Sequence, residues 1–178
     1  MSLLRCPPLR TFPRACFHLE YAFHDPNARS VINTYAVTAV TFQRRALFLR
    51  TVNAELLVNT IFRYRDQGRF LLHAFVVMPE HLHVMLTPGK GQTVERCAQC
   101  IKGGFSFSVR KQFAGEVWQA GFHEHRIRDT EDFRNQIEYV AANPGRQRLI
   151  DYPFVHTNYA SLLDANPDAM ADVGARLK

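Results

Sequence analysis

The spacing of apolar and polar residues along the middle of the chain predicts a series of strands and helices. Residues 35–43 and the run "FLLHAFVVM" at 70–78 are rich in β-branched and aromatic side chains, as strands usually are. A turn at Pro79-Glu80 separates the second run from "HLHVMLTP", residues 81–88, which has the same character. Strands are therefore predicted at four places: 35–43, 70–78, 81–88 and 117–128.

Three other segments carry the apolar spacing and end signals of helices. Residues 52–68 repeat apolar side chains at helical intervals and stop at a glycine. Residues 93–113 begin with a threonine suited to cap a helix, although a Gly-Gly pair inside the segment is expected to weaken or kink it. Residues 129–143 have acidic side chains in their first turn and are expected to end before Pro144.

The order of these elements predicts the fold class. Strand, helix, strand, strand, helix, strand and helix, joined by tight turns, indicate an α+β fold. We expect a ferredoxin-like antiparallel sheet with helices packed on one face, formed by residues 34–162. Residues 1–33 are proline-rich and are expected to be a loosely ordered extension or a DNA-binding arm, and residues 163–178 a C-terminal tail.

The net charge of the 178-residue chain is +6, which makes a polyanionic partner plausible. Residues 1–50 account for +5 of it, and the remaining residues for +1. The body of the chain is therefore not uniformly basic, and a nucleic-acid site there would be a local patch.

Apolar runs and cysteines limit where the protein is expected to act. The longest apolar stretches are strand-length and interrupted by proline, so no membrane partner is expected. The arginine and prolines near the N-terminus do not fit an export signal, and the four cysteines are then most simply free thiols. We expect a cytoplasmic protein.

His81 and His83 form the first candidate site. Alternate residues of a strand project to the same face, so these two imidazoles lie side by side while Leu82 points to the other layer. A shared divalent cation would give both rings a partner. The alternative is that each is a buried histidine satisfied by ordinary hydrogen bonds.

Tyr139 and Asn143 form the second candidate pair. Their spacing of four residues places them on one face of the helix predicted at 129–143. A phenol can act as a nucleophile, and an amide oxygen suits Mg²⁺ or Mn²⁺. The alternatives are an amphipathic tyrosine and an asparagine that ends a helix.

Three stretches carry a family resemblance: "HAFVVMPEHLHVMLTP", "VWQAGFHEHRIRDTEDFRNQIEYVAANPGRQRLI" and "DYPFVHTNYAS". Together they resemble the single-tyrosine HUH transposases, and most closely the REP-associated tyrosine transposases of bacterial chromosomes. The resemblance covers roughly residues 35–160. It rests on the histidine–hydrophobic–histidine motif and on a second block, which comprise His81, Leu82, His83, Trp118, Phe122, Arg126, Arg128, Asp129, Tyr139, Asn143 and Pro144.

The resemblance implies a transposase that cleaves and rejoins single-stranded DNA beside hairpins. His81, His83 and Asn143 would then hold one Mg²⁺ or Mn²⁺ ion. The phenol of Tyr139 would attack the scissile phosphate, leaving a 5′-phosphotyrosine link and a free 3′-hydroxyl, without a nucleotide cofactor. The partner would be DNA with REP-like or insertion-sequence hairpins, bound by a monomer or a homodimer.

Seven basic residues are the candidates for contacts with DNA phosphates, although each alone is more often part of a solvated face. They are Lys102, Arg110, Lys111, Arg126, Arg128, Arg146 and Arg148. Of the other polar residues near the motifs, Glu80 could tune the metal or face solvent, and we expect it to face solvent. The pair His123 and His125 is expected to be structural or close to DNA, the alternative being a second metal site. Phe105 and Phe107 are expected to lie in the core, the alternative being platforms on which DNA bases stack.

Two other functions remain open from the sequence. One is a domesticated protein that binds DNA hairpins without mobility. The other is a metal-dependent phosphodiesterase in which water, and not Tyr139, attacks. A covalent protein–DNA adduct distinguishes the transposase from both.

Overall fold

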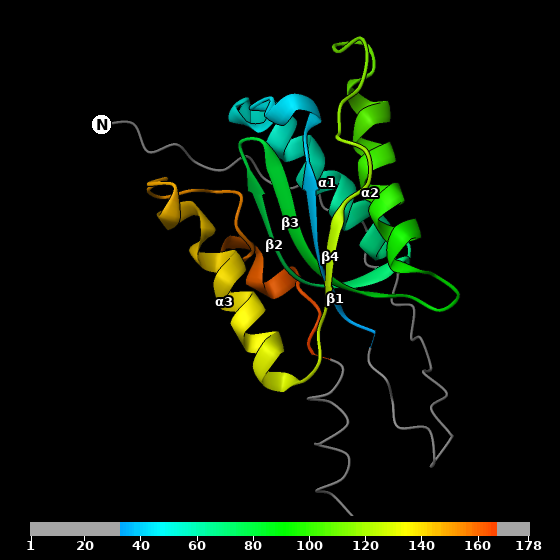
Figure 1. Ribbon diagram of the computed structural model, residues 1–178, viewed down its shortest axis with the longest axis vertical. Helices are drawn as coiled ribbons and strands as arrows, with labels where there is room; N and C mark the ends of the chain where they lie inside the picture. Colours follow the sequence, from blue (N-terminus) through cyan, green and yellow to red (C-terminus); the bar gives the residue numbers. More distant parts are fainter. Residues whose placement is uncertain (1–32, 167–178) are drawn as a thin grey trace, which may run out of the picture. The chain divides into compact units, whose positions relative to one another are not determined.

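The computed structural model describes residues 33–166, which form four strands and three α-helices (Figure 1). The N-terminal arm expected at 1–33 and most of the tail expected at 163–178 lie outside the described residues. Short 3₁₀ turns occur at Phe42–Arg44, Leu47–Leu49 and His156–Leu162. The elements are β1 (Tyr35–Val40), α1 (Thr51–Asp66), β2 (Phe70–Met78), β3 (His81–Pro88), α2 (Val94–Val109), β4 (His123–Arg126) and α3 (Thr130–Arg146).

The strands form one antiparallel sheet in the order β2-β3-β1-β4, which confirms the predicted α+β, ferredoxin-like class. Several predicted elements have different bounds: β1 ends at Val40 instead of 43, and α2 ends at Val109 instead of 113. The strand expected over 117–128 is confined to four residues, because Gly121 takes a left-handed conformation (φ +69°) just before it. Helix α3 continues through Pro144 to Arg146, and Asn143 and Pro144 are both buried in this added part of the helix.

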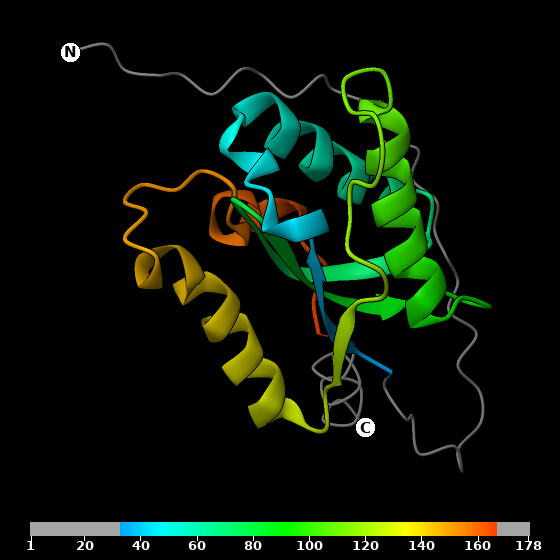
Figure 2. The same ribbon diagram turned by 45° about the horizontal axis from the view of Figure 1, so that its top comes forward.

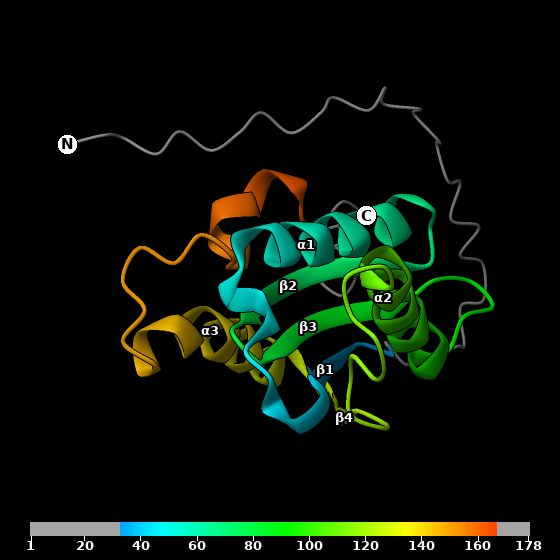
Figure 3. The same cartoon turned by 90° about the horizontal axis from the view of Figure 1, so that it is seen from above.

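The helices occupy both faces of the sheet, whereas we expected them on one. Helices α1 and α2 share a core with Val37, Phe75 and Val84, and α3 packs on the opposite face against Ala74 and Met85. Figures 2 and 3 show α3 well separated from α1 and α2, with the sheet between the two layers. The reason is visible in β2, whose consecutive buried residues leave both faces of that strand to be covered.

The Gly103-Gly104 pair lies within α2 without ending it. A Cβ on Gly104 would lie 2.7 Å from the ring of Tyr64 and 3.0 Å from the methyl of Thr60, both on α1. Gly104 therefore allows the two helices to pack closely, whereas Gly103 has open space around it.

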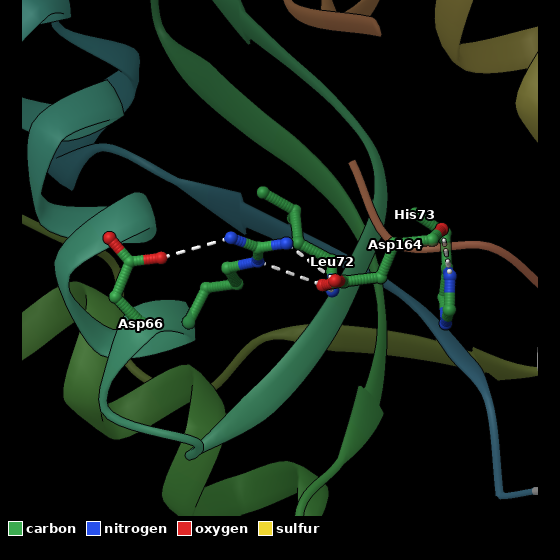
Figure 4. Close-up of polar contacts among 5 residues, drawn as sticks. Asp66, Leu72, His73 and Asp164 are labelled. Carbon is green, nitrogen blue, oxygen red and sulfur yellow. Dashed lines mark hydrogen bonds and ion pairs between the residues drawn. The ribbon is translucent and has the colours of Figure 1, made fainter. Parts of the chain in front are cut away.

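The segment after α3 returns along the outer edge of β2. Val77 N–H donates to the carbonyl of Phe154, and Asp164 N–H donates to the carbonyl of Leu72 (2.8 Å). The Asp164 carboxylate accepts from Leu72 N–H and from two nitrogens of Arg65, at 2.8, 2.9 and 2.5 Å (Figure 4). One strand edge of the sheet is thereby covered by the chain itself.

Across residues 33–166, no helix is both long and apolar enough to pass through a membrane.

Candidate active site

The candidate site lies on the face of the sheet that α3 covers. His81 and His83 project there from β3, on the opposite side from Leu82, which enters the core under α1 and α2. Thr38 of β1 pairs with His83 on one side and with His123 of β4 on the other. Since directly paired residues point to the same face, a row of polar side chains crosses three strands below α3.

The two imidazoles of the motif are close neighbours, as predicted. Their ring centroids are 4.6 Å apart, with the rings nearly perpendicular (81°). Burial lowers the pKa of His81, and burial together with the neighbouring His81 lowers the pKa of His83 to about 4. Both rings are therefore neutral at physiological pH, which is the form that binds a metal ion.

Each imidazole is held through its Nδ1 atom. His81 Nδ1–H donates to the Glu80 carboxylate (3.1 Å), and His83 Nδ1 is hydrogen-bonded to the Thr38 hydroxyl (2.7 Å). The lone pair of the neutral His81 ring is then on Nε2, where it is available to a cation, and the same holds for His83 when its Nδ1–H donates to Thr38. Such partners orient metal-binding histidines. The expectation that Glu80 faces solvent is wrong, because its side chain is only 20% exposed and also lies 3.8 Å from Arg44.

Tyr139 of α3 lies over this pair. Its ring centroid is 5.6 Å from that of His83, in an edge-on arrangement, and the residue is 39% exposed. The Arg146 guanidinium lies 4.7 Å from the centre of the same ring. A phenol, a cation and two neutral imidazoles are thus brought together from one helix and one strand.

Asn143 is buried one turn after Tyr139, on the same helix. Its side chain contacts the backbone carbonyl of Tyr139 at 2.7 Å, and a carbonyl can only accept, so the amide nitrogen donates. The amide oxygen, the only atom of this group that suits a cation, is not used by that bond. Its role as a ligand stays a prediction.

The two imidazoles fit a divalent cation whose remaining ligands come from other groups. Among the described residues, no three His, Cys, Asp or Glu side chains are grouped so as to hold a metal ion. A cation bound by His81 and His83 would therefore need an amide such as that of Asn143, water or a phosphate oxygen as further ligands. Oxygen ligands of these kinds are those that Mg²⁺ and Mn²⁺ prefer.

A pocket opens beside the phenol. It is lined by Thr38 and His83 from the sheet, by His123 and His125 from β4, and by Gln136 and Tyr139 from α3. The pair on β4 thus lies next to the candidate site, and its expected role, structural or close to DNA, stays a prediction. Thr38 and Gln136 were not found from the sequence, and no local signal marks them. Their place depends on strand register and on the docking of α3.

The seven basic candidates do not form one cluster. Arg146 lies at Tyr139, and Arg148 follows two residues later. Lys102 lies in α2, and Arg110 and Lys111 follow its last residue. Arg126 of β4 pairs with Tyr35, on the face of the sheet that α2 covers. Arg128 lies between β4 and α3.

Two of the α2 residues are already engaged within the protein. The Lys102 ammonium donates to the carbonyls of Gln119 and Gly121, and burial lowers its pKa. The Arg110 guanidinium lies 3.5 Å from the centre of the Phe107 ring. Phe105 is in the core, as predicted, but Phe107 is 64% exposed, so its assignment to the core is wrong.

The chain is similar to several known proteins. The family model described as IS200-like transposase matches residues 31–143, more than half of the chain. A REP-associated tyrosine transposase of Escherichia coli (strain K12) is 29% identical over 127 residues, covering 65% of this chain and 71% of that protein. A putative REP-associated tyrosine transposase of Haemophilus influenzae is 24% identical over 102 residues, covering 46% and 55%.

A solved structure has the same fold. It is the structure of a REP-associated tyrosine transposase bound to a REP hairpin, with a TM-score of 0.64 and 26% sequence identity. The match covers 76% of this chain and 86% of the other.

Proposed function

Because the chain belongs to the IS200-like transposase family, we propose that it cleaves single-stranded DNA beside a hairpin and transfers the strand through Tyr139. The observation that carries this proposal is the edge-on contact between Tyr139 and His83, 5.6 Å between ring centres. It brings the only phenol of the pocket next to the pair of neutral imidazoles.

In the proposed reaction, the phenol oxygen of Tyr139 attacks the scissile phosphorus in line with the leaving oxygen. A tyrosine–phosphorus bond forms, the phosphorus–3′-oxygen bond breaks, and the phenol proton is balanced by the proton that the leaving 3′-oxygen gains. The reverse step, on a different 3′-hydroxyl, rejoins the strand and needs no nucleotide cofactor.

His81 and His83, with Asn143 as the proposed third ligand, would hold one Mg²⁺ or Mn²⁺ ion. A bound cation would supply charge stabilisation to the phosphate oxygens. Glu80 and Thr38 keep the two rings oriented through Nδ1. Arg146 adds a fixed positive charge beside Tyr139, where an anionic phosphate would lie.

Hairpin DNA is the proposed partner, as in the related transposase whose structure includes a REP hairpin. Since Arg146 lies against Tyr139 and Arg148 follows two residues later, we infer that the cleaved strand follows the α3 side of the sheet. Contacts from Arg110, Lys111, Arg126 and Arg128 would involve other parts of the DNA, in the cytoplasm where chromosomal hairpins are available.

The test uses single-stranded oligonucleotides that contain the hairpins flanking the gene. Wild-type protein with Mn²⁺ should give a covalent species on denaturing gels, lost in Tyr139→Phe and in His81→Ala. Tyr139→Phe should retain most of its DNA affinity, which is measured in parallel. Cleavage without an adduct would instead indicate attack by water, and hairpin binding without cleavage would indicate a binding protein.

A further inference from the structure

A second contact joins α3 to the sheet, away from the His83–Tyr139 contact. Nε2–H of His125, on β4, donates to the Asp132 carboxylate in the first turn of α3, with distances of 2.9 and 3.1 Å to the two oxygens. The Asp132 side chain is only 19% exposed. The same carboxylate accepts from Arg128 N–H at 3.1 Å, so it is fixed from two sides.

The two contacts lie on one face of the helix. Asp132 and Tyr139 are seven residues apart, which is close to two full turns, so both side chains point toward the sheet from the same side of α3. On the sheet, His83 pairs with Thr38 of β1, and His125 pairs with Ala36 of the same strand. Ala36 and Thr38 are alternate residues of β1, so His83 and His125 project to the same face. The helix is therefore aligned by a polar contact at its first turn and by a ring contact two turns later.

Other contacts of α3 with the sheet involve apolar and aromatic side chains, among them the Phe133 ring, which lies 5.3 Å from the His73 ring. Phe133 and Val140 pack against Ala74, Val76 and Met85. Apolar packing is not directional, and it tolerates a small rotation of a helix about its axis. A hydrogen bond to a carboxylate that is held from two sides is directional and does not tolerate such a rotation.

We propose that His125 and Asp132 are positioning residues for Tyr139. Their hydrogen bond sets the rotation of α3 about its axis and thereby the place of the phenol relative to His83. The expected effect on the reaction rate rests on the proposed function. The expected effect on the orientation of α3 does not. His125 itself need not touch the DNA to act in this way.

The geometric part is tested on the DNA-free protein by NMR. NOEs between the aromatic protons of His83 and Tyr139 should be present in the wild type and lost or strongly reduced in His125→Leu. His125→Gln retains a donor nitrogen that can reach Asp132, and it should restore them. Unchanged NOEs in a folded His125→Leu variant would overturn the proposal, whether or not the wild type cleaves DNA.

The kinetic part uses the single-turnover rate of adduct formation at saturating DNA. His125→Leu should lower that rate about 10- to 100-fold, the effect expected when a reacting group is misplaced by about 1 Å. Affinity for the hairpin should stay within about twofold of wild type, because the variant changes alignment and not the DNA-binding charges. His125→Gln should recover most of the rate.

Ile61→Val is the matched control for stability. Ile61 is buried on the opposite face of the sheet, so its truncation lowers the melting temperature without touching α3. Its adduct rate should equal that of the wild type. An equal loss of rate in Ile61→Val, no rescue by His125→Gln, or a wild-type rate in His125→Leu would each overturn the positioning role. Absence of an adduct in the wild type would instead overturn the proposed function, and the NMR result would still decide the geometry.

Discussion

The Glu80 carboxylate lies 3.1 Å from Nδ1 of His81, so the residue directly before the histidine pair orients one of its rings. A carboxylate in this position raises the basicity of the imidazole and fixes which nitrogen faces a metal ion. Glu80 is held in turn between His81 and Arg44, the latter at 3.8 Å.

Glu80→Ala is therefore expected to weaken Mn²⁺ binding about 10- to 100-fold, as loss of such an outer partner usually does. Isothermal titration calorimetry of the DNA-free protein measures it. Glu80→Gln keeps an acceptor oxygen, so its affinity for Mn²⁺ should lie between those of the wild type and Glu80→Ala. The control is Arg44→Ala, since that side chain is 68% exposed and its effect should be small. Equal Mn²⁺ affinity in Glu80→Ala and wild type would show that His81 does not depend on this contact.

Asp164 is expected to contribute to stability far more than its position near the end of the fold suggests. Asp164→Ala removes the partner of Leu72 N–H and the two hydrogen bonds that Arg65 makes to this carboxylate, and the Arg65 side chain is 27% exposed. The free energy of unfolding should fall by about 2 kcal/mol in urea denaturation. Asp66 pairs with the same arginine at 3.0 Å but is 59% exposed, so Asp66→Ala should cost less than about 0.5 kcal/mol. Similar losses in both variants would contradict the assigned importance of the Asp164 contacts.

Stability is expected to fall as the pH drops below about 6.5, because burial lowers the pKa of several histidines. Their pKa in the unfolded chain is the ordinary 6.5, whereas that of His83 in the folded protein is about 4. Between these values the unfolded state binds protons that the folded state does not, so acid favours unfolding. Each such histidine contributes a slope of about 1.4 kcal/mol per pH unit.

His73 allows this prediction to be tested away from the candidate metal ligands. Its Nδ1–H donates to the Asp164 carbonyl (3.0 Å) and its Nε2 is bonded to the Thr87 hydroxyl (2.8 Å), which a second ring proton would disturb. Urea unfolding at pH 7, 6 and 5, in the presence of EDTA, should show a shallower dependence in His73→Gln than in wild type. Identical slopes would mean that His73 takes up its proton equally well in both states.

Arg146 and Arg110 are expected to differ in their contribution to DNA binding. Arg146 lies over Tyr139, and Arg110 lies on the end of α2, with its guanidinium on Phe107. Arg146→Ala should reduce the salt dependence of hairpin binding by about one counterion and weaken affinity several-fold. Arg110→Ala should change affinity less. Fluorescence anisotropy over a series of salt concentrations measures both, and a larger effect at Arg110 would place the cleaved strand on the α2 side instead.

The residues of the candidate site that the sequence predicted are those linked by local periodicity. His81 and His83 share a face because strands alternate, and Tyr139 and Asn143 share one because helices repeat every 3.6 residues. Thr38 could not be found in this way, since it meets His83 through pairing of β1 with β3, 45 residues apart in sequence. Nor could the contact between His125 and Asp132, which depends on how α3 turns back over β4.

The placement of α3 on the second face of the sheet is the main difference from the expected fold. A signal for it was present in β2, where nearly every residue is apolar and none alternates with a solvent-facing one. The hydrophobic pattern of α3 itself indicates that one side of the helix is buried. It carries no information about which face of the sheet that side meets.

The strand order has a consequence for the sequence of events in folding. Only β2 and β3 are neighbours both along the chain and in the sheet, whereas β1 must find β3 and then β4 across long separations. Loop closure favours the β2–β3 hairpin as an early structure. We therefore expect the histidine pair to be aligned on a nascent hairpin before Thr38 or Tyr139 arrives. The chemistry proposed for Tyr139 would become available only once α3, the last α-helix within residues 33–166, has emerged from the ribosome.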